Sequence, residues 1–257
     1  MVKQALSRGD KVFATVRKIS TLDELKASFP ESLQVLQLDL TDLDSVLSAV
    51  DTAFMAGPID FVVSNAGYGL FGVAEALTDQ QIDRQITTNL TGSIQLIRAA
   101  LPHLRKQDTG RIVQISSEGG QVAYPNFSLY HASKWGIEGF IESVSQEVSE
   151  YGIDCVIIEP GPTETNFAKG LDLADSLESY QNSAAEKMRR ALFNGDFPIK
   201  GDADNTVTAM LKVIDMPKAP FRVALGSIAF DNIHRALTSR LAELERQKNL
   251  AYSADKK

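Results

Sequence analysis

The sequence is short of the features that mark secreted and membrane-spanning proteins. Cys155 is its one cysteine, so a disulfide framework is excluded and a reducing compartment is expected. Its longest apolar runs, such as Cys155 to Ile158, fall far short of the roughly 18 residues that a membrane helix requires. The opening residues MVKQALSRGDK contain no apolar secretion segment, so we expect a cytoplasmic protein without a membrane span.

Basic residues are also fewer than acidic residues. There are 33 acidic and 26 basic residues, and the net charge of -7 predicts no broad surface for nucleic acid or an anionic membrane. His103, His131 and His234 lack acidic or cysteine partners at metal-ligand spacing, so no metal site is expected. At 257 residues and 44% hydrophobic content, the chain can bury a sizeable core, and we expect a single domain over 1–257.

Short β-branched runs alternate along the chain with longer stretches of helical period. The strands expected are Val12 to Val16, Leu33 to Leu38, Ile59 to Ser64, Gly110 to Ile115, Ile153 to Ile158 and Phe221 to Leu225. The helices expected are Thr41 to Met55, Thr78 to Arg105, Ser128 to Tyr151 and Asp231 to Lys248. This alternation predicts an α/β fold, with a doubly wound parallel sheet of the Rossmann-like type and helices on both faces.

Two segments depart from the alternation. Val2 to Leu6 has the pattern of the last turns of a helix that ends at Gly9, so the chain is expected to start inside a βαβ unit with the first strand absent. Pro162 to Lys200 is a long connection with scattered apolar residues. It is expected to be either a substrate lid or an ordinary helical insertion.

Glycines provide only a weak phosphate-binding match. Gly67 to Gly72 is a literal G-x-G-x-x-G after a strand, but a new helix cap at Thr78-Asp79 follows it. A dinucleotide fingerprint runs directly into a helix, so a glycine-rich turn is the favoured interpretation.

Tyr130 and Lys134 lie four residues apart and therefore share one helix face. An ammonium beside a phenol lowers the phenol's pKa from its free value near 10, which favours a general acid or base at this position. Ser117 follows the strand Gly110 to Ile115, and the glycines and proline after it let the chain turn back towards Tyr130. The two hydroxyls are expected to bind one carbonyl oxygen.

Five ordered motifs resemble those of the short-chain dehydrogenases/reductases. They are Ser64-Asn65-Ala66-Gly67, Asn89-Leu90, Gly110 to Val113 with Ile115-Ser116-Ser117, Tyr130 to Lys134 as Y-x-x-S-K, and Pro160 to Thr165. The resemblance covers essentially the whole chain and is nearest to the hydroxysteroid and retinol dehydrogenase-like branch. It implies an oxidoreductase that acts on CH-OH groups.

The resemblance also implies a role for each matching residue. Tyr130 would exchange a proton with the substrate oxygen, which Ser117 would hold. Lys134 would lower the tyrosine pKa and bind the nicotinamide ribose, and Asn89 would position a water that links Lys134 to solvent. The remaining cofactor-binding residues implied are Asp39, Leu40, Asn65, Ala66, Gly67, Pro160, Gly161, Thr163 and Thr165.

Basic residues after the strand Val12 to Val16 bear on the choice of cofactor. An acidic residue there receives ribose hydroxyls, whereas an arginine accommodates a 2'-phosphate. This chain has Arg17 and Lys18, so NADP is favoured over NAD, although the two could simply solvate a loop.

The chain departs from the family at one place. The glycine-rich loop T-G-x-x-x-G-x-G and the strand before it are absent, which leaves an expected gap of two strand spacings, roughly 9 to 10 Å, between Val12 to Val16 and Ile59 to Ser64. A misplaced start or truncation is the simplest hypothesis.

Three functions therefore compete. The first is NADP-dependent interconversion of an alcohol and a ketone or aldehyde, on a small lipophilic substrate. The second is a catalytically silent member that binds a ligand or partner, and the third is a dehydratase or epimerase in which the cofactor is not consumed overall. The resemblance implies a homodimer or homotetramer that packs through Thr78 to Arg105 and Ser128 to Tyr151.

Overall fold

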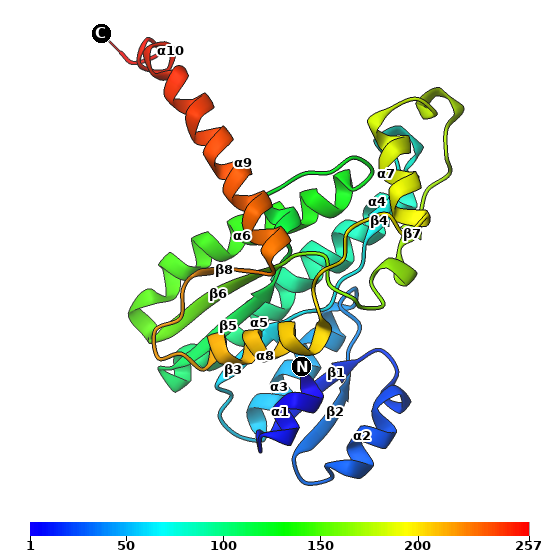
Figure 1. Cartoon of the computed structure of the whole chain (residues 1–257). Coiled ribbons are helices and arrows are strands. Elements are labelled where there is room, and N and C mark those ends of the chain that lie inside the picture. Colours follow the sequence, from blue (N-terminus) through cyan, green and yellow to red (C-terminus); the bar gives the residue numbers. More distant parts are fainter. Residues whose placement is uncertain (257) are drawn as a thin grey trace.

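A four-stranded parallel sheet lies at the centre of the molecule (Figure 1). The structure is a computed structural model, and it describes residues 1–256. The strand order is β3-β5-β6-β8, with β3 at Phe61–Ser64, β5 at Gly110–Ile115, β6 at Ile153–Pro160 and β8 at Arg222–Leu225. All four strands run parallel, as the alternation of strands and helices predicts.

Helices cover both faces of this sheet because successive strand residues point in opposite directions. Ile112 and Ile157 pack on one face against α3 (Leu43–Met55), α5 (Gly92–Gln107) and α6 (Ser128–Val148). Val113 and Ile158 pack on the other face against α8 (Ala203–Ile214) and α1 (Val2–Ser7). The predicted α/β architecture, doubly wound with a buried sheet, is confirmed.

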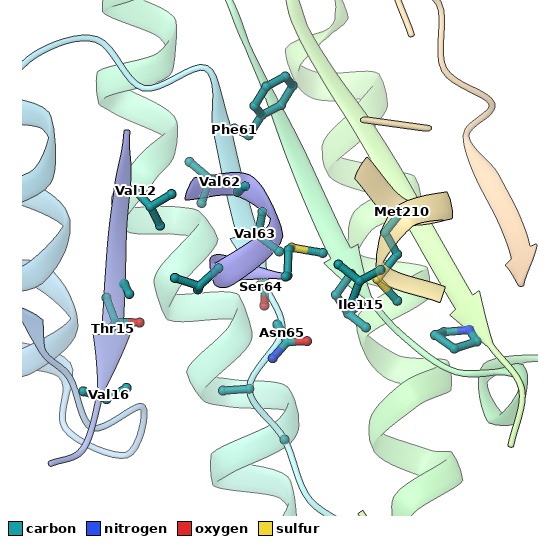
Figure 2. A pocket seen from close by; sticks show the side chains of 18 of the residues that line it. Val12, Thr15, Val16, Phe61, Val62, Val63, Ser64, Asn65, Ile115 and Met210 are labelled. Atoms are coloured by element: carbon teal, nitrogen blue, oxygen red, sulfur yellow. The ribbon is translucent and has the colours of Figure 1, made fainter. Parts of the chain in front are cut away.

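The first strands form a separate small sheet. Strand β1 (Val12–Val16) pairs in parallel with β2 (Leu33–Gln37), and α2 (Asp23–Ser28) lies beside them. No strand pairing joins β1 to β3 within residues 1–256, so the predicted gap between them is confirmed. Figure 2 shows Val12 and Val16 on one side of the resulting space and Val62 on the other.

The helical path from Thr78 to Arg105 is interrupted. Helix α4 (Asp79–Ile86) begins with a capping box between Thr78 and Gln81, then Thr87–Thr91 forms one turn of π-helix, and α5 continues to Gln107. The single regular helix expected there is wrong in this respect. Turns of this kind concentrate at functional sites, and this one contains Asn89.

The end of β6 differs from the sequence-based range for a tertiary reason. Strand β6 continues to Pro160, beyond the expected Ile158, because β8 pairs with it through Pro160 and Leu225. Glu159 is buried there and binds the Arg222 guanidinium at 2.6 Å, so a charge that interrupts the apolar run is compensated from a neighbouring strand.

The 162–200 connection contains the 3₁₀ turn Ala168–Gly170, the two-residue strand β7 (Asp172–Leu173), a second 3₁₀ turn and α7 (Ala184–Phe193). Strand β7 pairs with β4 (Leu70–Phe71), so the G-x-G-x-x-G match is a glycine-rich turn and strand, as favoured. A Cβ on Gly72 would lie 2.5 Å from that of Ala174, so glycine permits this close approach.

The chain ends in α9 (Ser227–Arg246) and α10 (Lys248–Tyr252), whose far end projects away from the sheet (Figure 1). Helix α9 starts four residues before the expected Asp231. Helices α2 and α8 were not expected, although Val207, Met210, Leu211 and Ile214 have helical spacing. Within residues 1–256, no helix has the length and hydropathy needed to cross a bilayer.

Candidate active site

The carboxyl ends of β3, β5 and β6 meet at one edge of the sheet, beside a cavity of about 1880 Å³. Asn65 follows β3, Ser117 follows β5 and Gly161 follows β6. Helix α6 contributes Tyr130 and Lys134 from the adjacent face. The topology therefore brings to one edge residues that are nearly a hundred positions apart in the sequence.

Ser117 and Tyr130 both line this cavity. Ser117 caps a short 3₁₀ turn, where its Oγ accepts from the Gly119 N–H at 3.0 Å. Burial raises the pKa of the Tyr130 phenol to about 12, while hydrogen bonding with Ser117 acts in the opposite direction. The phenol therefore keeps its proton at neutral pH.

Lys134 is buried, and its Nζ donates to the Ile115 carbonyl oxygen at 3.0 Å. Burial lowers the pKa of this ammonium to about 8, and the Glu138 carboxylate opposes the shift. The Nζ atom lies 5.7 Å from the centroid of the Tyr130 ring. Burial of the phenol dominates and raises the Tyr130 pKa, so the role of Lys134 in lowering that pKa stays a prediction.

Asn89 lies behind the cavity wall and does not line it. Its Oδ1 accepts from the Tyr68 N–H at 3.0 Å, and its Nδ2 donates to the Tyr68 carbonyl oxygen at 2.7 Å. The π-helical turn directs this amide across to the segment after β3. Asn89 thus holds the backbone next to Gly67 in place. A Cβ added to Gly67 would lie 3.2 Å from the Asn89 Oδ1.

Most of the predicted cofactor residues share the same cavity. The residues that line it are Leu40, Asn65, Ala66, Gly67, Tyr130, Lys134, Pro160, Gly161, Thr163 and Thr165. Arg17 and Asp39 lie outside this lining, at the ends of β1 and β2. Hydrogen bonds from Thr41 lower the pKa of the Asp39 carboxyl, with a smaller contribution from the Arg17 charge, so these two side chains are near each other.

Aromatic rings surround the Tyr130 phenol, a feature that the sequence motifs do not reveal. Phe167 lies with its ring centroid 5.5 Å from that of Tyr130, and Phe127 lies 6.0 Å away on another side. Both also line the cavity. The space next to Tyr130 is therefore apolar, which suits a hydrophobic reactant.

The sequence motifs also do not reveal two clusters of polar side chains beside Ser117. His131 binds the backbone of Gly119 and Tyr124, and the Glu118 carboxylate accepts from the Tyr124 hydroxyl at 2.8 Å. Asn232 of α9 donates to that hydroxyl at 2.9 Å. Only the position of His131 beside Tyr130 gives a sequence signal for this arrangement.

Metal and thiol chemistry find no support at this edge. Within residues 1–256, no group of three His, Cys, Asp or Glu side chains is arranged to hold a metal ion. Cys155 is buried in β6, and burial raises the pKa of its thiol to about 12. The thiol is therefore protonated and inert at neutral pH.

The fold and the polar side chains at the carboxyl edge of the sheet are together typical of a dehydrogenase, and comparison with known proteins agrees. The model of the short chain dehydrogenase family matches residues 1–175. The chain belongs to the short-chain dehydrogenases, and it is an oxidoreductase of that family.

Several relatives resemble it over much of its length. Oxidoreductase BOA17 of Botryotinia fuckeliana is 32% identical over 99% of this chain and 93% of its own. Human 17-beta-hydroxysteroid dehydrogenase type 1 is 35% identical over 63% of this chain and 51% of its own, in keeping with the branch that the motifs resemble.

Among solved structures, a short-chain dehydrogenase from Streptomyces avermitilis has a TM-score of 0.90 and 31% identity, covering 99% of this chain and 94% of its own. A Burkholderia cenocepacia short chain dehydrogenase in complex with NADP has a TM-score of 0.73 and 22% identity, covering 95% and 90%. At that identity the second likeness shows the fold.

Proposed function

We propose that this protein interconverts an alcohol and a ketone or aldehyde by hydride transfer with NADP(H). The observation that carries the proposal is that Ser117, Tyr130 and Lys134 line one cavity, which also borders the segments after β3 and β6. A hydroxyl, a protonated phenol and an ammonium at one apolar edge can bind a carbonyl oxygen and supply its proton.

The side chains at this edge fit a nicotinamide cofactor. An ammonium has three N–H donors, and within residues 1–256 the Lys134 Nζ uses one of them, for the Ile115 carbonyl oxygen, so donors remain for ribose hydroxyls. The Ser64 Oγ is buried, has no hydrogen-bond partner within residues 1–256 and belongs to a residue of the cavity wall. The Lys134 ammonium and the Ser64 hydroxyl can therefore bind polar groups of a ligand in this cavity.

When bound, the cofactor supplies or accepts the hydride. Tyr130 moves the proton at the substrate oxygen, and Ser117 holds that oxygen. Lys134 orients the ribose through its remaining donors. Asn89, fixed to the Tyr68 backbone, shapes the wall behind Gly67. The family resemblance implies that it also positions a water that connects Lys134 with solvent.

The protonation states of Tyr130 and Lys134 at pH 7 suit proton donation to a substrate oxygen. Because the pKa of Tyr130 is about 12, the phenol is present at pH 7 and can donate a proton to a developing alkoxide. The pKa of Lys134 is about 8, so the ammonium still carries its charge at that pH.

The preference for NADP rests on the end of β1. Arg17 and Lys18 follow Val16 and are exposed, and within residues 1–256 neither forms an ion pair. A guanidinium next to the adenosine ribose would receive a 2'-phosphate bidentately. Asp39 on the adjacent strand end accepts hydrogen bonds from Thr41 at 2.9 and 2.8 Å, and with Leu40 it would border the adenine.

A lipophilic substrate suits the remaining walls. Phe127, Phe167 and Leu171 line the cavity near Tyr130, and the last two come from the 162–200 segment. This segment would act as a substrate lid. The relative named 17-beta-hydroxysteroid dehydrogenase points to apolar alcohols and ketones, which fits a cavity with these side chains.

A catalytically silent, ligand-binding member is the second candidate. The observation behind it is that the space between β1 and β3 is lined by aliphatic side chains such as Val12 and Val62 (Figure 2). In residues 1–256 no glycine-rich loop that runs directly into a helix lies beside this space. A diphosphate there would lack the backbone N–H groups that usually hold it.

Two measurements decide between the candidates. Fluorescence titration with NADPH, and with NADH as the comparison, is expected to give tight binding that selects NADPH. Turnover of NADPH with the apolar ketone α-tetralone is expected to disappear in Tyr130→Phe. Absence of cofactor binding by a folded chain would favour the silent member, and unchanged turnover would remove Tyr130 from the mechanism.

We expect one domain over 1–257, working in the cytoplasm, where the single buried thiol of Cys155 stays reduced. A homodimer or homotetramer would form through α4, α5 and α6.

A further inference from the structure

His131 joins the catalytic helix α6 to the segment that carries Ser117. Its ring lies in a buried pocket of aromatic side chains, with ring centroids of Tyr124, Tyr130 and Phe127 at 5.7, 5.9 and 6.1 Å. The Nδ1 atom lies 2.9 Å from the Gly119 carbonyl oxygen, and Nε2 lies 2.8 Å from the Tyr124 backbone nitrogen. Both ring nitrogens therefore have backbone partners on one segment.

These partners determine the tautomer. A carbonyl oxygen can only accept, so Nδ1 must carry the hydrogen, and a backbone N–H can only donate, so Nε2 must be bare. A neutral ring protonated at Nδ1 is the one form that satisfies both contacts. Burial acts in the same direction, because it lowers the pKa of His131.

Gly119 connects this histidine to Ser117. Its carbonyl oxygen accepts from His131, and its N–H donates to the Ser117 Oγ at 3.0 Å. A Cβ on Gly119 would lie 2.8 Å from the His131 Nδ1 and 3.2 Å from the Tyr130 Cε1, so the backbone passes directly over both rings. Displacement of the Gly119 peptide would therefore move the Ser117 hydroxyl relative to Tyr130.

We propose that His131 is a positioning residue that, as the Nδ1–H tautomer, holds the Gly119 peptide and thereby sets the distance between the Ser117 hydroxyl and the Tyr130 phenol. This inference rests on the proposed function of Ser117 and Tyr130. His131 touches no reacting atom, and its effect passes through Gly119.

Three substitutions separate the two hydrogen bonds from the volume of the ring. His131→Asn keeps an amide donor near the Nδ1 position, and His131→Gln keeps an acceptor near the Nε2 position. His131→Phe keeps the ring but neither bond. His234→Phe is the control, since His234 is an exposed histidine of α9 that stacks on Phe230.

The decisive readout is amide hydrogen exchange of Gly119 and Tyr124 in the protein without cofactor, followed by NMR. In His131→Phe, both amides are expected to exchange about 10-fold faster or more. His131→Asn should keep the Gly119 carbonyl oxygen bound, so that the Gly119 N–H stays on the Ser117 Oγ and protected while Tyr124 exchanges faster. His131→Gln should protect the Tyr124 amide alone. The control should match the unsubstituted protein at both amides.

Kinetics with NADPH and α-tetralone supply the second readout. His131→Phe and His131→Gln are expected to lower kcat by about 10- to 100-fold with the KM for NADPH unchanged, whereas His131→Asn stays within about 5-fold. A role in packing alone predicts the reverse order, because phenylalanine fills the pocket best.

Failure of the positioning role of His131 gives different results from failure of the proposed function. Tyr130→Phe should abolish turnover and leave the Gly119 amide protected. If His131→Phe retains protection of Gly119, the positioning role is wrong, whatever the turnover. If His131→Phe does not fold, the opposite protection patterns of the Asn and Gln variants test the proposal, and identical patterns would overturn it.

Discussion

The Phe167 ring of the 162–200 segment lies 5.5 Å, centroid to centroid, from the ring of Tyr130 on α6. Phe167 also lies against Gly69, where an added Cβ would meet its Cζ at 2.7 Å. The 162–200 segment therefore packs both against the turn before β4 and against the Tyr130 ring. We therefore expect a substrate that reaches Tyr130 to contact this ring.

Removal of that ring should weaken the binding of apolar substrates. In Phe167→Ala we expect the KM for α-tetralone to rise about 10-fold, because an aromatic wall is lost, while kcat changes less. Steady-state kinetics measure both constants. Phe230→Ala is a control, since Phe230 is exposed on α9. An unchanged KM would show that Phe167 does not contact the substrate.

Tyr130→Phe removes the proton that the mechanism requires and little else. Turnover of NADPH with α-tetralone should fall by about 100-fold or more, since general acid catalysis contributes on that scale. The NADPH dissociation constant should stay within about threefold. Tyr151→Phe, at an exposed tyrosine, is the matched control. Equal rates for the two variants would contradict the role of Tyr130.

Arg17→Asp tests the cofactor preference. The substitution places a carboxylate where a 2'-phosphate would lie, so NADPH binding should weaken by about 100-fold, whereas NADH binding should be unchanged or tighter. Fluorescence titration with each nucleotide measures the change. Arg98→Asp on α5 is the control for charge alone, because Arg98 is outside the cavity lining. Equal losses for both nucleotides would remove Arg17 from the site.

The buried charge of Lys134 should give stability a characteristic pH dependence. Its pKa is about 8 in the folded chain and 10.5 in the unfolded chain, so between these values the unfolded state binds more protons. The contribution of Lys134 to stability therefore rises with pH across that window and is least favourable below pH 8. We expect Lys134→Met to have a higher Tm than the unsubstituted protein at pH 7 and the difference to shrink towards pH 10.5.

The same titration should limit catalysis. Above about pH 8 the Lys134 ammonium loses its charge, so turnover should decline there. Thermal denaturation and rate profiles over pH 6 to 10 measure the two effects, with Lys212→Met on α8 as a control. A Tm for Lys134→Met that is lower at pH 7 than that of the unsubstituted protein would contradict a costly buried charge.

Light scattering tests the assembly. Helices α4, α5 and α6 are expected to pack against those of a second copy, so the mass in solution should be two or four times 28.0 kDa. A monomer at micromolar concentration would contradict this expectation.

Much of the fold could be predicted because its signals are local. The β-branched runs of β1 and β5 have the bounds that the sequence indicates, and the helix α6 starts at the expected Ser128. The sequence also predicts that Gly69 and Gly72 belong to a turn and not to a dinucleotide fingerprint. Alternation and capping residues need no knowledge of distant partners.

Other features depend on partners that the sequence places far away. The extension of β6 through Glu159 needs Arg222 of β8, and the π-helical turn around Asn89 needs the backbone of Tyr68. The two hydrogen bonds of His131 need a segment that turns back over α6. Each is a polar group whose burial is tolerated only because a distant group satisfies it.

The sequence by itself determined the α/β class, the order of the elements and the residue types that the family motifs require, because periodicity and spacing are properties of neighbouring residues. Only the tertiary structure decided which side chains share the cavity, that burial raises the pKa of Tyr130 and depresses the pKa of Lys134, and that Phe167 lies against the phenol ring. Solvent exclusion and contacts between distant segments arise when strands and helices pack, and they set these energies.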